Sequence, residues 1–435
     1  MTLGRRALIR GAVGAAAALA LPRAARATGG IIEGDADAAQ LGATPPPISV
    51  RPLPGDSVRV LLLRARPSVS LSAPQGFALF DRAPGTPPLL RAAAAQPLAV
   101  DAALLARASG GAIAEALGEG PLYVDGRPYR GRLLLMSEGG GVLVVNELPV
   151  DLYVLGVLGR EISPAWPPAV LQAHAIISRT YALGRRKDAA HAFDLSAGTA
   201  DQVYGGMSAE SPRGNDAVYQ TRGRLLWYAE GLASAFFHSC CGGHTESASA
   251  LWRQEIPYLQ GVADPYCVGA PHYRWRSYIG CDTLRSRLGP DISDAGQISA
   301  LQPIDIDPSG RATRIAVDGS RGQRDLEAKV FRQRIGTSVV RSTLLHRIQV
   351  ADSPERLQPD PAFDDPSPAP PPQPPRGGPL AMLEGAGWGH GVGLCQWGAR
   401  GLALRGGSVS EILAFYFPGT SVRSAPSSAG AQTPR

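Results

Sequence analysis

One glutamate, Glu161, occupies a position where a carboxyl group can do acid chemistry. It follows the apolar run 153–158 and precedes the turn formed by residues 163–166. A carboxyl group at such a junction is partly removed from water, which raises its pKa and keeps it protonated near neutral pH, as a general acid requires. The alternative is an ordinary solvated glutamate whose charge is favoured by the N-terminus of the following helix.

A helix is expected directly after this turn. Pro167 and Pro168 fit its first turn, where a missing N–H group is tolerated, and Gly184 fits its C-terminal end. Apolar residues recur at helical spacing and predict a face that packs in the core: Val170, Ala173, Ile177 and Tyr181. The polar residues of the same helix are Gln172, Arg179 and Thr180.

Two motifs and the segments between them resemble one protein family. The first motif includes Asn146-Glu147-Leu148-Pro149, Glu161, Gln172-Ala173-His174-Ala175 and Arg179-Thr180-Tyr181-Ala182. The second is Gly387-Trp388-Gly389-His390-Gly391, followed by Cys395-Gln396-Trp397-Gly398. Segments 202–206, 237–245, 258–267 and 416–420 fall in the family's order. From about 58 to 422, the chain thus resembles the stage II sporulation protein D family, also known as amidase enhancers.

This resemblance implies a peptidoglycan lytic transglycosylase in which Glu161 is the catalytic acid and base. Such an enzyme cuts MurNAc–GlcNAc strands without water, because the sugar's own O6 attacks C1 and leaves a 1,6-anhydro end. No cofactor is required for this chemistry, and a strand stripped of its stem peptides is the expected substrate. The implied substrate-binding residues are Gln172, Arg179, Thr180, Tyr204, Trp388, His390 and Gln396. The alternative is a non-catalytic glycan-binding protein that stimulates a cell-wall amidase.

The glycine-rich second motif has a physical interpretation of its own. Residues 385–391 include four glycines, which allow positive φ values and the close approach of another chain to the backbone. Trp388 and Trp397 can stack on sugar rings, while His390 and Gln396 can hydrogen-bond sugar hydroxyls or Glu161 itself. The alternative is a tight turn in a barrel with Trp388 in the core.

Cysteine and histidine residues cluster between the two motifs and leave two alternatives open. The cluster comprises His238, Cys240, Cys241, His244 and Cys267. Thiolate and imidazole groups from this set can bind a structural Zn²⁺. In an exported protein, a Cys241–Cys267 disulfide is the other outcome, in a segment that the family often pairs in this way. Cys281 and Cys395 are expected to be unpaired, with Cys395 a small buried residue.

The first residues indicate export. Arg5-Arg6-Ala7-Leu8-Ile9-Arg10 resembles a twin-arginine motif, and a mildly apolar run follows at 11–21. Ala25-Arg26-Ala27 supplies a small-x-small cleavage site, so residues 1–27 are expected to be a removed signal. An uncleaved anchor and a general secretory signal are the alternatives. We expect a mature protein that is periplasmic or associated with the cell wall and has no membrane segment.

Composition favours one elaborated globular unit. The chain has 435 residues, of which 44% are hydrophobic, enough for a substantial core. Its 52 glycines and 39 prolines favour many turns and a strand-rich fold over a helical bundle. The net charge of +6 can attract anionic wall polymers. A nucleic-acid partner is not expected, because the basic residues are scattered and no aromatic-basic binding motif is present.

The predicted fold class is α+β, a strand-rich single catalytic domain with a few helices and a Pro-rich insertion. Eleven prolines in 354–379 exclude helix and interior sheet there, so this segment is expected to be extended or disordered. The expected organisation is a signal at 1–27, a linker at 28–47, a domain at 48–422, an insertion at 353–379 and a disordered tail at 423–435. Within the domain, a β region spans 48–145, and the core spans 146–350 and 380–422.

Local patterns predict several of the elements. Strands are expected at 58–63, and at 131–136 and 141–145 as a hairpin that turns at Gly139-Gly140. A helix is expected at 102–117. Later strands are expected at 312–317 and 344–350, on either side of a short helix at 326–336.

Overall fold

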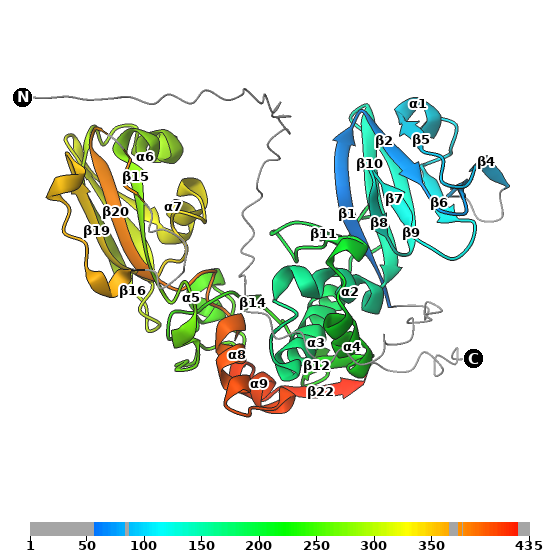
Figure 1. Cartoon of the computed structure of the whole chain (residues 1–435). Helices are drawn as coiled ribbons and strands as arrows, with labels where there is room; N and C mark the ends of the chain where they lie inside the picture. Colours follow the sequence, from blue (N-terminus) through cyan, green and yellow to red (C-terminus); the bar gives the residue numbers. More distant parts are fainter. Residues whose placement is uncertain (1–55, 83–86, 365–372, 376, 425–435) are drawn as a thin grey trace, which may run out of the picture. The chain divides into compact units, whose positions relative to one another are not determined.

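The computed structural model describes residues 56–82, 87–364, 373–375 and 377–424. The expected signal peptide, the linker and residues 425–435 of the expected tail lie outside this range. Within it, strands and helices are mixed as predicted for an α+β fold (Figure 1).

The N-terminal β region is built on a seven-stranded sheet with the order β11-β1-β10-β9-β6-β3-β4. The predicted strand at 58–63 and the predicted hairpin are both confirmed. The hairpin turns at Gly139 and Gly140, whose φ values of 58° and 80° give the backbone geometry that tight hairpins favour. The strands are β1 (Ser57–Arg66), β3 (Phe77–Asp81), β4 (Pro88–Ala92), β6 (Ala112–Ala116), β9 (Arg132–Glu138), β10 (Gly141–Pro149) and β11 (Leu195–Ser196).

A second, four-stranded sheet has the order β5-β2-β7-β8. Its strands are β2 (Ser68–Ser72), β5 (Leu98–Asp101), β7 (Leu122–Val124) and β8 (Arg127–Tyr129). The helix expected at 102–117 is wrong for most of its length, because α1 covers only Ala102–Leu105. Gly110 and Gly111 then take φ values of 147° and 111°, and the chain continues as β6, which pairs with β3 and β9. Alanine-rich sequence here is overridden by strand pairing.

Three helices follow the β region and carry the first motif. The helix predicted after Pro167 is confirmed as α3 (Pro168–Gly184), with Pro168 in its first turn. The apolar run that precedes it belongs to α2 (Val150–Glu161), which packs against α3, and α4 (Pro212–Gln220) packs against both. Among the described residues, none of the helices combines the length and the apolar character needed to cross a membrane.

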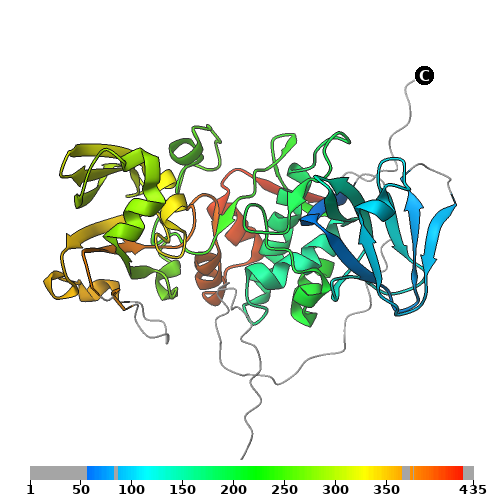
Figure 2. The same ribbon diagram turned by 90° about the horizontal axis from the view of Figure 1, so that it is seen from above.

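The second motif lies beside the first through α8 (Gln396–Leu404) and α9 (Val409–Tyr416), which both contact α3 (Figures 1 and 2). Two small sheets connect this region, with the orders β13-β12-β22 and β14-β21. Their strands are β12 (Arg224–Tyr228), β13 (Gly231–Leu232), β14 (Phe237–His238), β21 (Leu394–Cys395) and β22 (Ser421–Ser424). A short helix, α5 (Ala248–Trp252), lies between β14 and the rest of the cysteine-containing segment.

A separate hydrophobic cluster is formed by residues 275–383, around Trp275 and Phe331. Two three-stranded sheets contribute to it, in the orders β15-β20-β19 and β16-β17-β18. The strands predicted at 312–317 and 344–350 and the short helix between them are confirmed as β17, β19 and α7. The elements are β15 (Arg274–Gly280), β16 (Ile298–Ile306), β17 (Ala312–Gly319), β18 (Gly322–Glu327), β19 (Leu345–Ala351), β20 (Leu380–Ala386), α6 (Cys281–Leu288) and α7 (Ala328–Ile335).

The Pro-rich insertion departs from the expectation at its N-terminal end. Residues 353–364 contain two 3-10 turns, at Pro354–Arg356 and Pro361–Phe363, and the Phe363 side chain is buried. The backbone N–H of Asp360 donates to the buried carboxylate of Glu384 at 2.9 Å. The expected disorder is therefore corrected for this part, while residues 365–372 and 376 lie outside the described range.

Candidate active site around Glu161

Glu161 is the last residue of α2, so the helix end positions its carboxyl group. Ile162 already has an extended backbone, with φ −138° and ψ 154°, and Ser163 precedes Pro164, a position that disfavours helix. The helix arrives at this end with one buried face that includes Tyr153, Val154 and Val157. Glu161 as a residue is partly exposed, while its carboxyl group is largely removed from water.

The protein environment holds this carboxyl group near its protonation midpoint at neutral pH. Removal from water raises the pKa of Glu161 to about 7. A hydrogen bond from the Val203 backbone N–H at 2.7 Å, a second from the Gln396 side chain, and the charge of Arg160 oppose that rise. Among the described residues, no second carboxylate contributes to the shift, so the raised pKa of Glu161 does not come from pairing with another acid.

Gln396 links Glu161 to a buried histidine on α3. Its amide Nε2 lies 3.2 Å from Nε2 of His174, and Nδ1 of His174 lies 3.1 Å from the Ser178 hydroxyl. Burial lowers the pKa of His174 to about 3, so the ring is neutral. With the amide in this orientation, Nε2 of His174 accepts from Gln396 and Nδ1–H donates to Ser178. These contacts fix the orientation of the Gln396 amide, which faces the Glu161 carboxyl group.

Two tryptophans contact one another near the site: Trp397, which follows Gln396, and Trp166, in the turn after Glu161. Trp166 and Trp397 meet edge to face, with ring centroids 5.2 Å apart. The guanidinium of Arg400 lies 5.0 Å from the centroid of the Trp397 ring and 5.9 Å from that of Trp166. Trp397 is partly exposed and directly follows Gln396, so it remains a candidate for stacking on a sugar ring.

Three predicted substrate-binding residues are buried in the structure. Arg179 is 1% exposed and pairs with Asp151 through a 2.7 Å contact from its Nε, and Thr180 is fully buried and accepts the backbone N–H of Leu226. Tyr204 is 6% exposed, donates to Asn146 at 2.8 Å and stacks on α2. The prediction is corrected for Arg179 and Tyr204, because α4, β12 and the segment after Gly198 cover these two side chains. Thr180 is buried but lines the cavity at the C-terminal end of α3, so its predicted role stays a prediction.

The other predicted contacts lie in different places. Gln172 is half-buried and donates to Gln220 of α4. Trp388 packs edge to face on His272 at 4.5 Å, and His390 neighbours His238, with ring centroids 5.6 Å apart. Of the glycine-rich motif and its continuation, Gln396 is the residue that the structure brings to Glu161. The glycines allow a close approach of the protein's own backbone. A Cβ on Gly387 would lie 2.7 Å from the Cys240 carbonyl oxygen.

A cavity of about 570 Å³ opens at the C-terminal end of α3. Its lining includes Tyr181, Arg185, Phe236 and Trp252. The Arg185 guanidinium lies over the rings of Tyr181 and Phe236, at 5.1 and 5.7 Å from their centroids. Aromatic faces with an adjacent cation and hydroxyl suit a polar ring such as a sugar.

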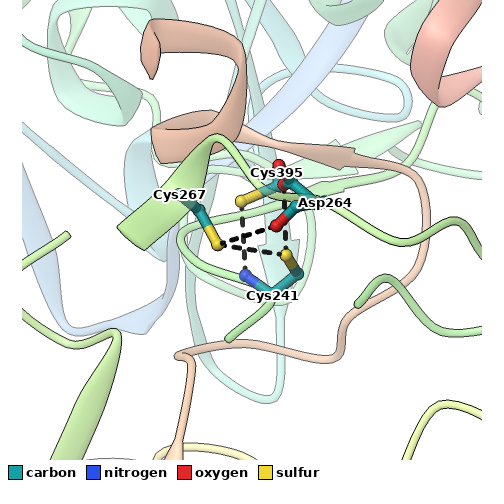
Figure 3. Close-up of side chains that lie close together, drawn as sticks. All are labelled: Cys241, Asp264, Cys267 and Cys395. Carbon is teal, nitrogen blue, oxygen red and sulfur yellow. Dashed lines mark hydrogen bonds between the residues drawn. The ribbon is translucent and has the colours of Figure 1, made fainter. Parts of the chain in front are cut away.

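The cysteine cluster differs in membership from the sequence prediction. Figure 3 shows Cys241, Asp264, Cys267 and Cys395 together, all buried, with one candidate ligand atom of each within 4.8 Å of the others. His238 and His244, which the sequence prediction included, are not part of this group; Nδ1 of each ring donates to a backbone carbonyl instead. Cys240 lies beside it, where its thiol contacts Cys267 and Cys395. Cys281 lies outside this group, as a free, buried thiol in the first turn of α6.

Comparisons with known proteins agree with the motifs. The profile of a family described as Stage II sporulation protein matches residues 138–228. An uncharacterised protein of Brachyspira hyodysenteriae is 33% identical over 302 residues, which cover 69% of this chain and 73% of that protein. Stage II sporulation protein D of Bacillus subtilis is 26% identical over 297 residues, covering 65% and 76%. The Amidase enhancer of Bacillus subtilis is 27% identical over 314 residues, covering 62% of this chain and 40% of the relative.

The fold and site thus define an α+β protein in which helices α2, α3 and α8 meet around one partly buried carboxyl group. The chain belongs to the stage II sporulation protein D and amidase enhancer family.

Several residues of the site escaped sequence reasoning. His174 and Ser178 are four residues apart on α3, a spacing that places them on one face of a helix and is the available signal for their contact. The Val203 N–H group leaves no trace in the sequence, because every non-proline residue carries one. Cys395 joins the other thiols through the parallel pairing of β14 and β21, and Asp264 through the antiparallel pairing of His244 with Ala263.

Proposed function

We propose that this protein is a peptidoglycan lytic transglycosylase in which Glu161 is both general acid and general base. The observation that carries the proposal is a single carboxyl group whose surroundings raise its pKa to about 7. At that pKa, the acid and its conjugate base are both populated at neutral pH, as a group that gives and then takes a proton requires. Ordinary glycosidases need two carboxyl groups, and the lone Glu161 fits a reaction in which the substrate supplies its own nucleophile.

The bond changes follow from that single group. Glu161 gives its proton to O4 of the departing GlcNAc as the C1–O4 bond to MurNAc breaks. The MurNAc O6 then bonds to C1, and its proton passes to the Glu161 carboxylate, which restores the acid. No water is consumed, and the product end is a 1,6-anhydro ring. The Val203 N–H and the Gln396 amide stabilise the carboxylate between the two proton transfers.

The names of the relatives support a role at the cell wall. One relative is called Stage II sporulation protein D and another Amidase enhancer, which point to bacterial wall material as the ligand of the family. The proposal puts the protein outside the cytoplasm, where such glycan is found, in keeping with the twin-arginine-like motif at Arg5-Arg6. Glycan strands freed of stem peptides remain the expected substrate.

Product analysis tests the proposal. The purified protein and its Glu161→Gln variant would be incubated with intact peptidoglycan and with peptide-free glycan strands, and the products analysed by mass spectrometry. We expect 1,6-anhydro-MurNAc ends from the wild type and none from Glu161→Gln, with Glu119→Gln, an exposed glutamate in a bend, as an active control. Equal product from Glu161→Gln would contradict the catalytic role.

A second candidate function is a glycan-binding enhancer of a cell-wall amidase. It is favoured by the relative named Amidase enhancer and by the aromatic cavity beside α3, which can bind sugar without cutting it. Under this function, Glu161→Gln retains the ability to stimulate an amidase, whereas Trp252→Ala, which removes a cavity wall, weakens glycan binding. Loss of amidase stimulation in Glu161→Gln, with unchanged glycan binding by Trp252→Ala, supports the transglycosylase.

A further inference from the structure

We propose that Cys241, Cys267 and Cys395, together with Asp264, bind a structural zinc ion. The four side chains come from three segments distant in sequence: the turn after β14, the segment that follows 258–263, and the N-cap of α8. Figure 3 shows their sulfur and oxygen atoms pointing toward one centre. The sequence prediction included histidines among the zinc ligands. The structure instead places Cys395 and Asp264 beside Cys241 and Cys267.

The spacing of the atoms suits a tetrahedral ion. Sγ of Cys241 lies 3.4 Å from Sγ of Cys267 and 3.1 Å from Oδ2 of Asp264. Zinc binds thiolate sulfur at about 2.3 Å and carboxylate oxygen at about 2.0–2.2 Å, so tetrahedral ligands lie about 3.5–3.8 Å apart. Small outward shifts of a few tenths of an ångström give this geometry.

Hydrogen bonds around the cluster favour charged ligands. Sγ of Cys395 accepts two backbone N–H groups, from Cys241 at 3.2 Å and from Gly398 at 3.3 Å, which stabilise a thiolate. The Tyr416 hydroxyl donates to Oδ2 of Asp264 at 2.9 Å, and the Tyr266 N–H donates to Oδ1 at 2.9 Å. Such bonds from outside the ligand set orient ligands and hold their charge.

Charge balance favours a cation over a disulfide. Asp264 is 1% exposed, and within the described part of the chain no basic side chain forms an ion pair with it. A buried carboxylate is costly without a compensating charge. A Cys241–Cys267 disulfide would use two of the three thiols and leave the Asp264 carboxylate without an opposite charge, whereas a divalent ion engages all four groups. The three thiolates select zinc over calcium or magnesium, which prefer oxygen ligands.

The inferred site lies one residue from the candidate active site. Cys395 is the N-cap of α8, where its side chain accepts the Gly398 N–H, and Gln396 follows it. An ion at Cys395 therefore ties the start of α8 to the turn at Cys241 and to Asp264. This inference concerns metal binding and does not depend on the proposed reaction.

Metal analysis of the full-length protein tests the site. We expect one zinc per chain by elemental analysis, and thiolate-to-cobalt charge-transfer bands after replacement of the zinc by Co²⁺. The Cys395→Ser variant should lose at least tenfold in zinc affinity, while Cys281→Ser, which removes a buried thiol outside the cluster, should retain the metal.

Other results would overturn the inference. Metal-free protein with a mass two hydrogens below that of the reduced chain would establish a disulfide. Metal-free protein with five titratable thiols would show that the cluster is an ordinary buried thiol group. Because Cys395→Ser can fail to fold, the cobalt spectrum of the unmodified protein carries the test alone: bands without thiolate character exclude these ligands. Transglycosylase activity enters none of these measurements.

Discussion

The pKa of Glu161 predicts that the Glu161→Gln variant gains stability relative to the wild type as pH rises. The folded protein raises the pKa of this carboxyl group from 4.5 to about 7 because it removes the group from water. Between these values, the folded state holds a proton that the unfolded chain has released, so the free energy of unfolding falls as pH rises from about 4.5 to 7. Below pH 4.5 both states are protonated, and the destabilisation vanishes. Glutamine is neutral at every pH and removes this dependence.

The magnitude follows from the same two pKa values. Each tenfold change in acidity is about 1.4 kcal/mol, so the full shift corresponds to about 3 kcal/mol. Glu161 is partly exposed, and solvent screening reduces this to about 2 kcal/mol. We therefore expect the stability of Glu161→Gln relative to the wild type to be about 2 kcal/mol greater at pH 8 than at pH 4.

Urea denaturation at pH 4, 6 and 8 measures this difference. Glu119→Gln, which changes an exposed glutamate, should follow the wild type at each pH and serves as the control. Parallel pH dependence for Glu161→Gln and the wild type would refute the reasoning, because it would mean that Glu161 titrates alike in the folded and unfolded chain.

Three further outcomes follow from the structure. Arg179→Met leaves Asp151 buried without its main partner and should lower the free energy of unfolding by about 3–5 kcal/mol, measured by urea denaturation. Arg222→Met, which removes the exposed partner of the same carboxylate, should lower it by less than about 1 kcal/mol. Equal losses would contradict the packing role of Arg179. Gly398→Ala places a Cβ 2.1 Å from the Asp264 carboxylate and should lower the melting temperature. Gly184→Ala, whose Cβ meets open space, should leave the melting temperature unchanged. An unchanged melting temperature for Gly398→Ala would contradict the close packing at that position. The rate of anhydro-end formation should fall about tenfold per pH unit above pH 7, as Glu161 loses its proton, and a flat profile to pH 9 would exclude it as the acid.

The sequence predicts those parts of the fold that local chemistry determines. Pro168 and Gly184 mark the ends of α3, and Gly139-Gly140 marks the β9–β10 hairpin, because these residues favour particular backbone geometries. The helix expected at 102–117 was wrong, since the pairing of β6 with two neighbours outweighs the helix propensity of alanine.

The candidate site, like the fold, was predicted only in part from the sequence. Glu161 was singled out from its position at an apolar boundary together with the family resemblance of the motif around it. The role of Arg179 was misjudged, because a polar residue on a helix can face either solvent or a buried partner, and α4 and β12 supply the partner. Cys395 lies 154 residues from Cys241, and no spacing rule anticipates their contact.

The most direct test of the central claim is a digestion of peptide-free glycan strands in water enriched in ¹⁸O, followed by mass spectrometry of the new ends. If Glu161 directs attack by the sugar's own O6, the wild type releases 1,6-anhydro ends that carry no ¹⁸O. Reducing ends labelled with ¹⁸O would show that water is the nucleophile and would contradict the single-carboxyl mechanism.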